Sequence, residues 1–132
     1  MKYYFAGSIR GGRDKADTYV KINELLEKNG TVLDKHVASN DVFKLESNNS
    51  EEEIYNRDIN WIKECDMVIA EISVPSIGVG YEIAYAESLN KKIICLCDEK
   101  TNASAMIAGN KNIELIKYSN EKELLNKLEK RI

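Results

Sequence analysis

Short apolar runs alternate with longer amphipathic segments along this chain, and this alternation constrains the fold more than any other feature. The apolar runs predict strands at residues 3–7, 31–33, 67–72, 93–97 and 113–117. The amphipathic segments predict helices at residues 13–29, 51–65, 78–89, 103–109 and 124–132. Strands joined by helices pair in parallel, and the helices cover both faces of the sheet. The sequence therefore predicts an α/β fold with a five-stranded parallel sheet.

The segment from residue 35 to residue 49 interrupts the alternation. It is polar, rich in serine and asparagine, and shows no regular spacing of apolar residues. We therefore expect a long loop, and loops of this length are usually either functional or disordered. The helix that follows begins with Ser50 and Glu53 at the spacing of a capping box.

Length and charge limit what the protein can do. The 132 residues suit one domain, and we expect a single domain over residues 1–132. Nineteen basic and 22 acidic side chains leave a net charge of −3, which argues against a protein that coats nucleic acid polymers. No apolar run approaches the ~20 residues of a membrane span. Residues 1–7 lack the long apolar region of a signal peptide, so we expect a cytoplasmic protein without membrane contact.

The cysteines and the one histidine do not form a metal-binding pattern. Cys95 and Cys97 lie two apart in a predicted strand, so they share one buried face, and the chain has no C-x-x-C motif. Cys65 is far from both in the sequence, and His36 is the single histidine. We expect no metal site and no cofactor.

Two segments follow strands whose carboxyl ends form the ligand-binding edge of such a sheet. The first is Gly7-Ser8-Ile9-Arg10-Gly11-Gly12-Arg13. Its glycines let the backbone approach a ligand closely, although the spacing matches neither the dinucleotide fingerprint nor the P-loop. The alternative interpretation is a tight turn with solvated arginines. The position of this segment, directly after the first strand, favours a ligand site.

The second segment is Pro75-Ser76-Ile77-Gly78-Val79-Gly80-Tyr81-Glu82. Its small residues lead into a helix, and the free N–H groups and dipole of a helix N-terminus favour an anion. The Ser76 hydroxyl can add a further donor. The alternative interpretation, a simple cap and turn, has equal weight on the sequence alone.

Two carboxylates and one phenol are candidates for catalysis. Glu82 shares a helical stripe with Ala86 and Leu89, so its carboxylate points toward the sheet, as suits a nucleophile or a general base. The alternative is a carboxylate that only stabilises the helix dipole. Asp58 lies on a partly apolar helix face, although its spacing alone favours a surface role. Tyr4 lies in the first strand, where a buried phenol usually finds a hydrogen-bond partner.

Four motifs stand in the order seen in a known family: Tyr4–Arg13, Asp58–Trp61, Pro75–Glu82 and Ser104–Ile107. In these motifs the chain resembles the 2'-deoxynucleoside 5'-phosphate N-hydrolases, within the nucleoside 2-deoxyribosyltransferase superfamily. The resemblance implies a flavodoxin-like, Rossmann-like three-layer fold and a homodimer. It also implies hydrolysis of the N-glycosidic bond of deoxynucleoside monophosphates.

The resemblance also implies residue roles. Glu82 matches the nucleophile that forms a glycosyl-enzyme ester, Asp58 the second catalytic carboxylate, and Tyr4 the tyrosine that positions the nucleophile. Ser104 matches a serine that reaches the phosphate from the partner subunit, and His36 lies in the loop that borders the base. The substrate-binding residues implied by the resemblance are Gly7, Ser8, Ile9, Arg10, Gly11, His36, Ser76, Gly78, Ser104 and Met106.

Ser76 favours a phosphorylated substrate. Transferases of the superfamily commonly carry an acidic residue near this position, which would repel a 5'-phosphate, whereas a serine can donate to it. Three alternatives stay open at this point. They are a deoxyribosyltransferase that uses a second base as acceptor, an N-glycosidase of ribonucleotides such as CMP, and a nucleotide-binding module without turnover.

Overall fold

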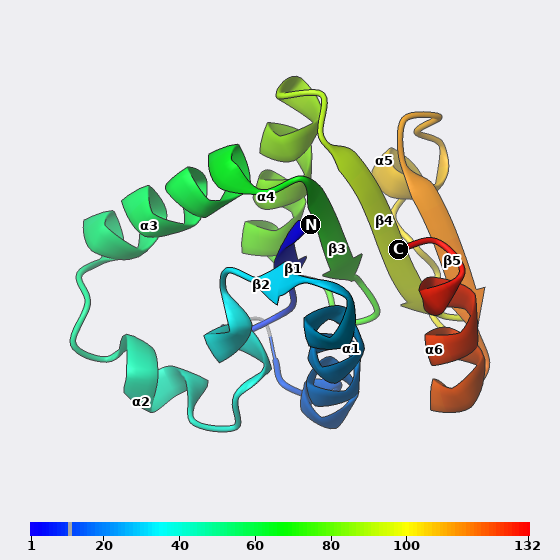
Figure 1. Ribbon diagram of the computed structural model, residues 1–132, viewed down its shortest axis with the longest axis horizontal. Helices are drawn as coiled ribbons and strands as arrows, with labels where there is room; N and C mark the ends of the chain where they lie inside the picture. Colours follow the sequence, from blue (N-terminus) through cyan, green and yellow to red (C-terminus); the bar gives the residue numbers. More distant parts are fainter. Residues whose placement is uncertain (11) are drawn as a thin grey trace.

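All five strands of the sheet are parallel, in the order β2-β1-β3-β4-β5. The computed structural model describes residues 1–10 and 12–132 (Figure 1). The strands are β1 (Lys2–Ala6), β2 (Thr31–Val32), β3 (Met67–Glu71), β4 (Lys92–Asp98) and β5 (Glu114–Tyr118). The predicted α/β fold with a five-stranded parallel sheet is confirmed.

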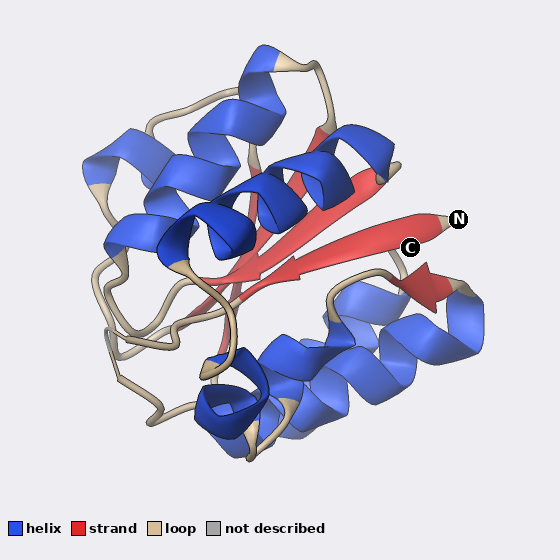
Figure 2. Cartoon of the chain, turned by 90° about the vertical axis from the view of Figure 1, so that its left-hand side faces the viewer, coloured by secondary structure: helices blue, strands red, loops and turns tan. Residues whose placement is uncertain are grey.

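Helices cover both faces of the sheet, as Figure 2 shows. The α-helices are α1 (Ala16–Asn29), α2 (Val42–Glu46), α3 (Glu51–Glu64), α4 (Ile77–Ser88), α5 (Ala105–Ala108) and α6 (Glu121–Glu129), and a 3-10 helix, η1, spans Lys35–Ala38. The predicted capping box is present at the start of α3, where Ser50 and Glu53 bond to each other's backbone.

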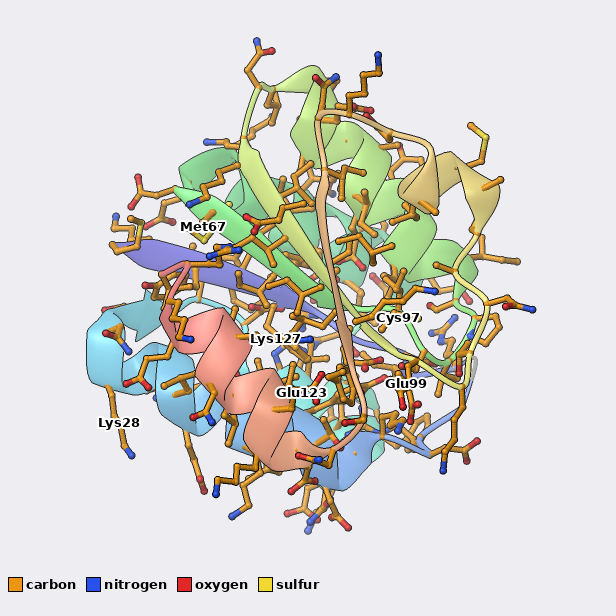
Figure 3. The ribbon with its side chains drawn as sticks, turned by 90° about the vertical axis from the view of Figure 1, so that its right-hand side faces the viewer. Lys28, Met67, Cys97, Glu99, Glu123 and Lys127 are labelled. Atoms are coloured by element: carbon orange, nitrogen blue, oxygen red, sulfur yellow. The ribbon has the colours of Figure 1, made fainter. Side chains whose placement is uncertain are left out.

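Side-chain alternation along the strands divides the core into two layers. Tyr3 and Phe5 of β1 pack against α1 and α6, whereas Tyr4 and Ala6 pack on the opposite face against α3 and α4. Helix α6 covers the first of these layers with its apolar side. Its solvent side carries Lys127 and Glu123, labelled in Figure 3, whose side chains form an ion pair of 2.7 Å. The resulting three layers confirm the predicted flavodoxin-like architecture.

The prediction of an irregular loop over residues 35–49 was wrong. This segment contains η1, which packs against α1, and α2, which follows it at the lower left of Figure 1. Three apolar side chains of this segment, Val37, Ala38 and Val42, are buried. Their burial holds the two short helices against the rest of the protein. Their spacing is too irregular to produce a helical pattern in the sequence, so burial rather than periodicity stabilises these turns.

This topology places the functional segments at one edge of the sheet. The chain leaves β1 at Ala6 and β3 at Glu71, and these two strands are neighbours with Ala6 paired to Ala70. The loops after both strands therefore lie together, where parallel α/β sheets bind their ligands. Over the described residues, none of the helices combines the length and the apolar character needed to cross a membrane.

Candidate active site

A cavity of about 680 Å³ opens at this edge, between the loop after β1, helix α3 and the start of α4. Its size lies in the range of small-molecule sites. The residues that line it are Gly7, Ile9, Arg10, Glu46, Glu51, Ile54, Tyr55, Asp58, Pro75, Ser76, Ile77, Gly78, Val79 and Glu82. The cavity thus brings together residues from the segments after β1 and β3, which the sequence analysis singled out, and from α3.

Glu82 is joined to the sheet by a hydrogen bond. Tyr4 on β1 is buried, and its hydroxyl donates to Oε2 of Glu82 on α4. Burial raises the pKa of Glu82 to about 8, even though the Tyr4 hydrogen bond lowers it. Burial and the nearby charge of Glu82 in turn hold the pKa of Tyr4 well above its usual value, so Tyr4 remains a donor. Tyr4 therefore fixes the orientation of a carboxylate that lines the cavity.

Asp58 is the second carboxylate that the sequence analysis singled out, and it also lines the cavity. It is half-buried on α3, where Oδ1 accepts a hydrogen bond of 3.0 Å from Nε of Arg57. Burial raises the pKa of Asp58, and the Arg57 guanidinium opposes this shift only in part. A carboxyl group with a raised pKa next to a binding cavity suits proton transfer.

Arg57 links Asp58 to a third carboxylate. Its Nη2 donates to Oε2 of Glu46 at 3.0 Å, and the guanidinium lies 4.9 Å from the centre of the Trp61 ring. His36 Nε2 is 3.7 Å from the same oxygen of Glu46. Burial and the charge of Arg57 lower the pKa of His36, which keeps its ring neutral near pH 7.

The sequence analysis missed Glu46, Glu51 and Tyr55 as cavity residues. Glu46 lies in the segment predicted as a loop, and its neighbours there provide no spacing that points to a site. The capping box at Ser50 located the start of α3, and Tyr55 and Asp58 then share one face at i, i+3. That spacing was the only available signal for Tyr55.

Ser76 and Gly78 line the cavity at the N-terminus of α4. Ser76 is the N-cap of this helix, and its Oγ accepts from the N–H of Val79 at 3.3 Å. Among the described residues, a Cβ at Gly78 would approach only Ser76 Oγ, at 3.9 Å, so none of their atoms requires a glycine there. The helix dipole places partial positive charge at this end of the cavity.

The loop after β1 divides into cavity residues and supporting residues. Gly7, Ile9 and Arg10 line the cavity, and the Arg10 guanidinium is 3.8 Å from the Glu51 carboxylate. Ser8 does not line it: this serine is buried, and its N–H donates to the Tyr19 hydroxyl at 2.9 Å. The predicted residue Gly11 lies outside the described residues.

Packing explains part of the glycine content of this loop. A Cβ at Gly7 would lie 2.9 Å from ring carbons of both Phe5 and Tyr19. Arg13 donates to the Ser8 carbonyl at 3.0 Å and to the Ser39 carbonyl at 2.9 Å, which ties the loop to the segment after η1. Gly7 and Arg13 thus have structural roles that do not depend on a ligand.

Three predicted binding residues besides Ser8 lie outside this cavity. His36 stands behind Glu46 and does not line it. Ser104 and Met106 line a second hollow of about 700 Å³, between α4 and α5. The two cavities adjoin through the shared residues Pro75, Ser76, Ile77 and Val79, but Ser104 lines only the second.

The cysteines are remote from this chemistry. Cys65, Cys95 and Cys97 are buried, and burial raises the pKa of the Cys65 thiol to about 11 and that of Cys95 to about 12. These thiols are therefore poor nucleophiles at neutral pH. Over residues 1–10 and 12–132, His, Cys, Asp and Glu side chains form no group of three or more that could hold a metal ion.

Comparison with known proteins identifies the family. The sequence model of the nucleoside 2-deoxyribosyltransferase family matches residues 3–126. A 5-hydroxymethyl-dUMP N-hydrolase of Tetraodon nigroviridis is 40% identical over 116 residues, which cover 85% of this chain and 82% of the relative. A Syntrophotalea carbinolica protein provisionally named 2'-deoxynucleoside 5'-phosphate N-hydrolase 1 is 41% identical over 126 residues, covering 94% of this chain and 89% of that protein.

A solved structure shows the same arrangement. The CMP N-glycosidase BcmB of Clostridium botulinum is 31% identical and superposes with a TM-score of 0.72 over 97% of this chain and 98% of its own. Agreement in sequence and in fold extends over nearly the whole chain. The chain belongs to the nucleoside 2-deoxyribosyltransferase family.

Proposed function

We propose that this protein hydrolyses the N-glycosidic bond of 2'-deoxynucleoside 5'-monophosphates and releases a free base and 2-deoxyribose 5-phosphate. The protein is an N-glycosidase: its relatives are named as N-hydrolases of nucleotides, and its structural neighbour is an N-glycosidase. The observation that carries the proposal is the pair of carboxylates, Glu82 and Asp58, that line one cavity with Tyr4 bonded to Glu82.

In the first step, a Glu82 oxygen forms a bond to C1' of the deoxyribose while the bond from C1' to the base nitrogen breaks. The electron pair of that bond stays with the base, which takes a proton from the Asp58 carboxyl group. Two carboxyl groups that act as nucleophile and acid are the pattern of retaining glycosidases. The sugar becomes cationic as the base leaves, and the negative charge of Glu82 stabilises it.

In the second step, water replaces the enzyme at C1'. The Asp58 carboxylate accepts a proton from that water, the water oxygen bonds to C1', and the ester bond to Glu82 breaks. This sequence restores both carboxyl groups to their starting forms and yields 2-deoxyribose 5-phosphate. Tyr4 holds one Glu82 oxygen throughout, which leaves the other oxygen for the sugar.

The start of α4 is the proposed phosphate site. Ser76, Gly78 and the N-terminal N–H groups of α4 supply donors and partial positive charge without a basic surface. Arg10 lines the same cavity and adds a positive charge. Phosphate binding away from C1' supplies binding energy that orients the reacting bond.

A homodimer would complete this site. Ile77 and Met106 beside the second hollow are 96% and 80% exposed, and large exposed apolar side chains are typical of an interface. The hollow adjoins the proposed phosphate site through Ser76 and Ile77. In the proposed dimer, Ser104 of one chain reaches the phosphate bound by the other.

The test is to incubate the pure protein with the four deoxynucleoside monophosphates, the matched nucleosides and the ribonucleotides, and to quantify released base. We expect release from deoxynucleoside monophosphates only. Release from CMP would favour the ribonucleotide alternative, to which the likeness to the CMP N-glycosidase points. Release from unphosphorylated nucleosides, with exchange when a second base is added, would indicate a transferase and contradict the phosphate role of Ser76.

A covalent intermediate can be sought directly. A brief reaction quenched with acid should leave a fraction of the protein heavier by one 2-deoxyribose 5-phosphate less one water. Peptide mass spectrometry should place this group on Glu82. Turnover without any such adduct in the parent protein, at times shorter than one turnover, would argue for direct attack by water.

A further inference from the structure

The cavity contains a carboxylate that the proposed reaction does not use. Glu46 is the last residue of α2, its side chain is 13% exposed, and it lines the cavity together with Asp58 and Glu82. Burying a carboxylate to this extent is costly unless it is paired and bonded. The contacts of Glu46 therefore indicate how its charge is used.

Only one of the two Glu46 oxygens is engaged by the protein. Oε2 accepts from Arg57 Nη2 at 3.0 Å and lies 3.7 Å from His36 Nε2. Among the residues that the structure describes, Oε1 has no hydrogen-bond donor. The Arg57 guanidinium is held in place by the Trp61 ring and by Asp58, so it fixes the Glu46 carboxylate at the cavity wall.

The shared guanidinium also locates Glu46 relative to the substrate. Arg57 binds Glu46 and Asp58 at once, so Glu46 lies at the end of the cavity where the departing base takes its proton. A phosphate dianion would be repelled by Glu46 and is instead accommodated at the N-terminus of α4. The base is thus the part of the substrate next to Glu46.

We propose that Glu46 selects the base by accepting a hydrogen bond from an exocyclic amino group, as found on cytosine, adenine and guanine. This inference rests on the proposed function. A carboxylate accepts from the amino group of a base, whereas uracil and thymine present a carbonyl oxygen where cytosine has that group. A uracil or thymine placed as cytosine is would turn its 4-carbonyl toward Glu46 and leave both groups without a donor, so the site disfavours these bases in that orientation.

The clearest test compares dCMP with dUMP, in which a carbonyl replaces that amino group and N3 carries a proton. We expect the parent protein to favour dCMP in kcat/KM, and Glu46→Gln to reduce the ratio of the two kcat/KM values about tenfold. The glutamine amide keeps the size of the side chain and can donate to the uracil carbonyl. Taking the ratio within one preparation cancels the fraction of folded protein, and comparing that ratio between parent and variant cancels the intrinsic reactivity of each base.

Glu52→Gln is the matched control. Glu52 is an exposed carboxylate in the first turn of α3 that does not line the cavity, so its loss changes net charge equally. We expect this variant to keep the parental ratio. A decline of the ratio in both variants would mean that overall charge sets the preference, and would overturn the role of Glu46.

A measurement on the parent protein alone covers the case in which Glu46→Gln does not fold. We expect dAMP to react with a higher kcat/KM than the purine deoxynucleotide that lacks only the 6-amino group. Base release with no preference in either pair would refute selection by Glu46 and leave the proposed function intact. Absence of base release from every nucleotide would instead refute the proposed function, on which this inference rests.

Discussion

The hydroxyl of Tyr4 donates a hydrogen bond to Glu82, although the two residues are 78 positions apart in the sequence. Tyr4 belongs to β1 and Glu82 to α4, so this bond joins the centre of the sheet to the helix that carries the proposed nucleophile. It orients the carboxylate through Oε2 and leaves Oε1 of this cavity-lining residue without a bond to Tyr4.

Glu82→Gln should abolish base release. An amide cannot form the proposed ester, so kcat should fall at least about a thousandfold. Steady-state assays with the best deoxynucleoside monophosphate measure this loss, and circular dichroism reports whether the variant is folded. Glu52→Gln should retain parental kcat. Full activity in a folded Glu82→Gln variant would show that another group attacks the sugar.

The activity should fall with rising pH above about 8. The proposed reaction needs an ionised Glu82 and a protonated Asp58, and burial raises the pKa of Glu82 to about 8, above the pKa of Asp58. Between the two pKa values, the gain in ionised Glu82 and the loss of protonated Asp58 cancel, so kcat/KM should stay level. Above about 8, Glu82 is ionised and only the protonated fraction of Asp58 still declines, so each pH unit should lower kcat/KM by up to about tenfold. A pH profile of kcat/KM over roughly 5.5 to 9.5 measures this alkaline limb, and a decline that already begins below about 7 would mean that Glu82 ionises in its ordinary range.

Tyr4→Phe should move that limb to higher pH. The Tyr4 hydrogen bond lowers the pKa of Glu82, so its removal leaves the effect of burial unopposed and raises the pKa further. We also expect kcat to fall about tenfold or more, because the nucleophile loses its fixed orientation. Tyr3→Phe is the control, since Tyr3 packs on the opposite face of the sheet. A limb unchanged by Tyr4→Phe would contradict the coupling.

Mixing two defective variants should restore activity if Ser104 acts across a dimer. A mixed dimer of Glu82→Gln and Ser104→Ala contains one site with an intact Glu82 from one chain and an intact Ser104 from the other. Base release by the mixture should therefore exceed the sum of the separate variants, after subunit exchange. Light scattering should report a dimer. A monomeric protein, or strictly additive activity after demonstrated exchange, would exclude this arrangement.

Asp34→Asn should stabilise the fold at alkaline pH. Asp34 is buried, its Oδ1 accepts from the N–H of Phe5 at 2.8 Å, and its Oδ2 has no partner among the described residues. Burial raises the pKa of Asp34 well above its usual value, so the folded protein retains a proton that the unfolded chain loses above about pH 4. Stability conferred by the protonated form is therefore lost as pH rises toward the folded-state pKa.

Asparagine keeps the acceptor for Phe5 and cannot ionise. We expect the free energy of unfolding of the Asp34→Asn variant to exceed that of the parent by about 1 kcal/mol at pH 8. This difference should become smaller as the pH is lowered toward about 5. Urea denaturation at several pH values measures the difference. Parallel pH dependences of parent and variant would show that Asp34 does not carry this linkage.

The sequence was sufficient for the sheet and for the core of the site. The apolar runs of β1, β3 and β4 are buried strands, and such runs are recognisable because every residue in them faces a covered side. The inward direction of Glu82 followed from its stripe with Ala86 on α4. Sequence periodicity detects these features because each depends on neighbours within one element.

The same reasoning failed where stability comes from distant contacts. Residues 35–49 contain two short helices that depend on the burial of Val37, Ala38 and Val42, and no local pattern reveals this. Ser8 stands in a loop that reads as ligand-binding, yet it is buried beneath Tyr19. In both cases, packing against residues far along the chain overrides the local signal.

The amino-acid sequence was enough to predict the order of the elements, the parallel pairing of the strands and the helices that carry Glu82 and Asp58. Only the folded structure shows which groups surround them: Tyr4 bonds to Glu82, Arg57 joins Glu46 to Asp58, and Ser104 lines the neighbouring hollow and not the cavity of Glu82. Secondary structure follows from short-range periodicity, whereas the direction of a side chain in a cavity depends on burial and charge contributed by elements that meet only in the folded chain.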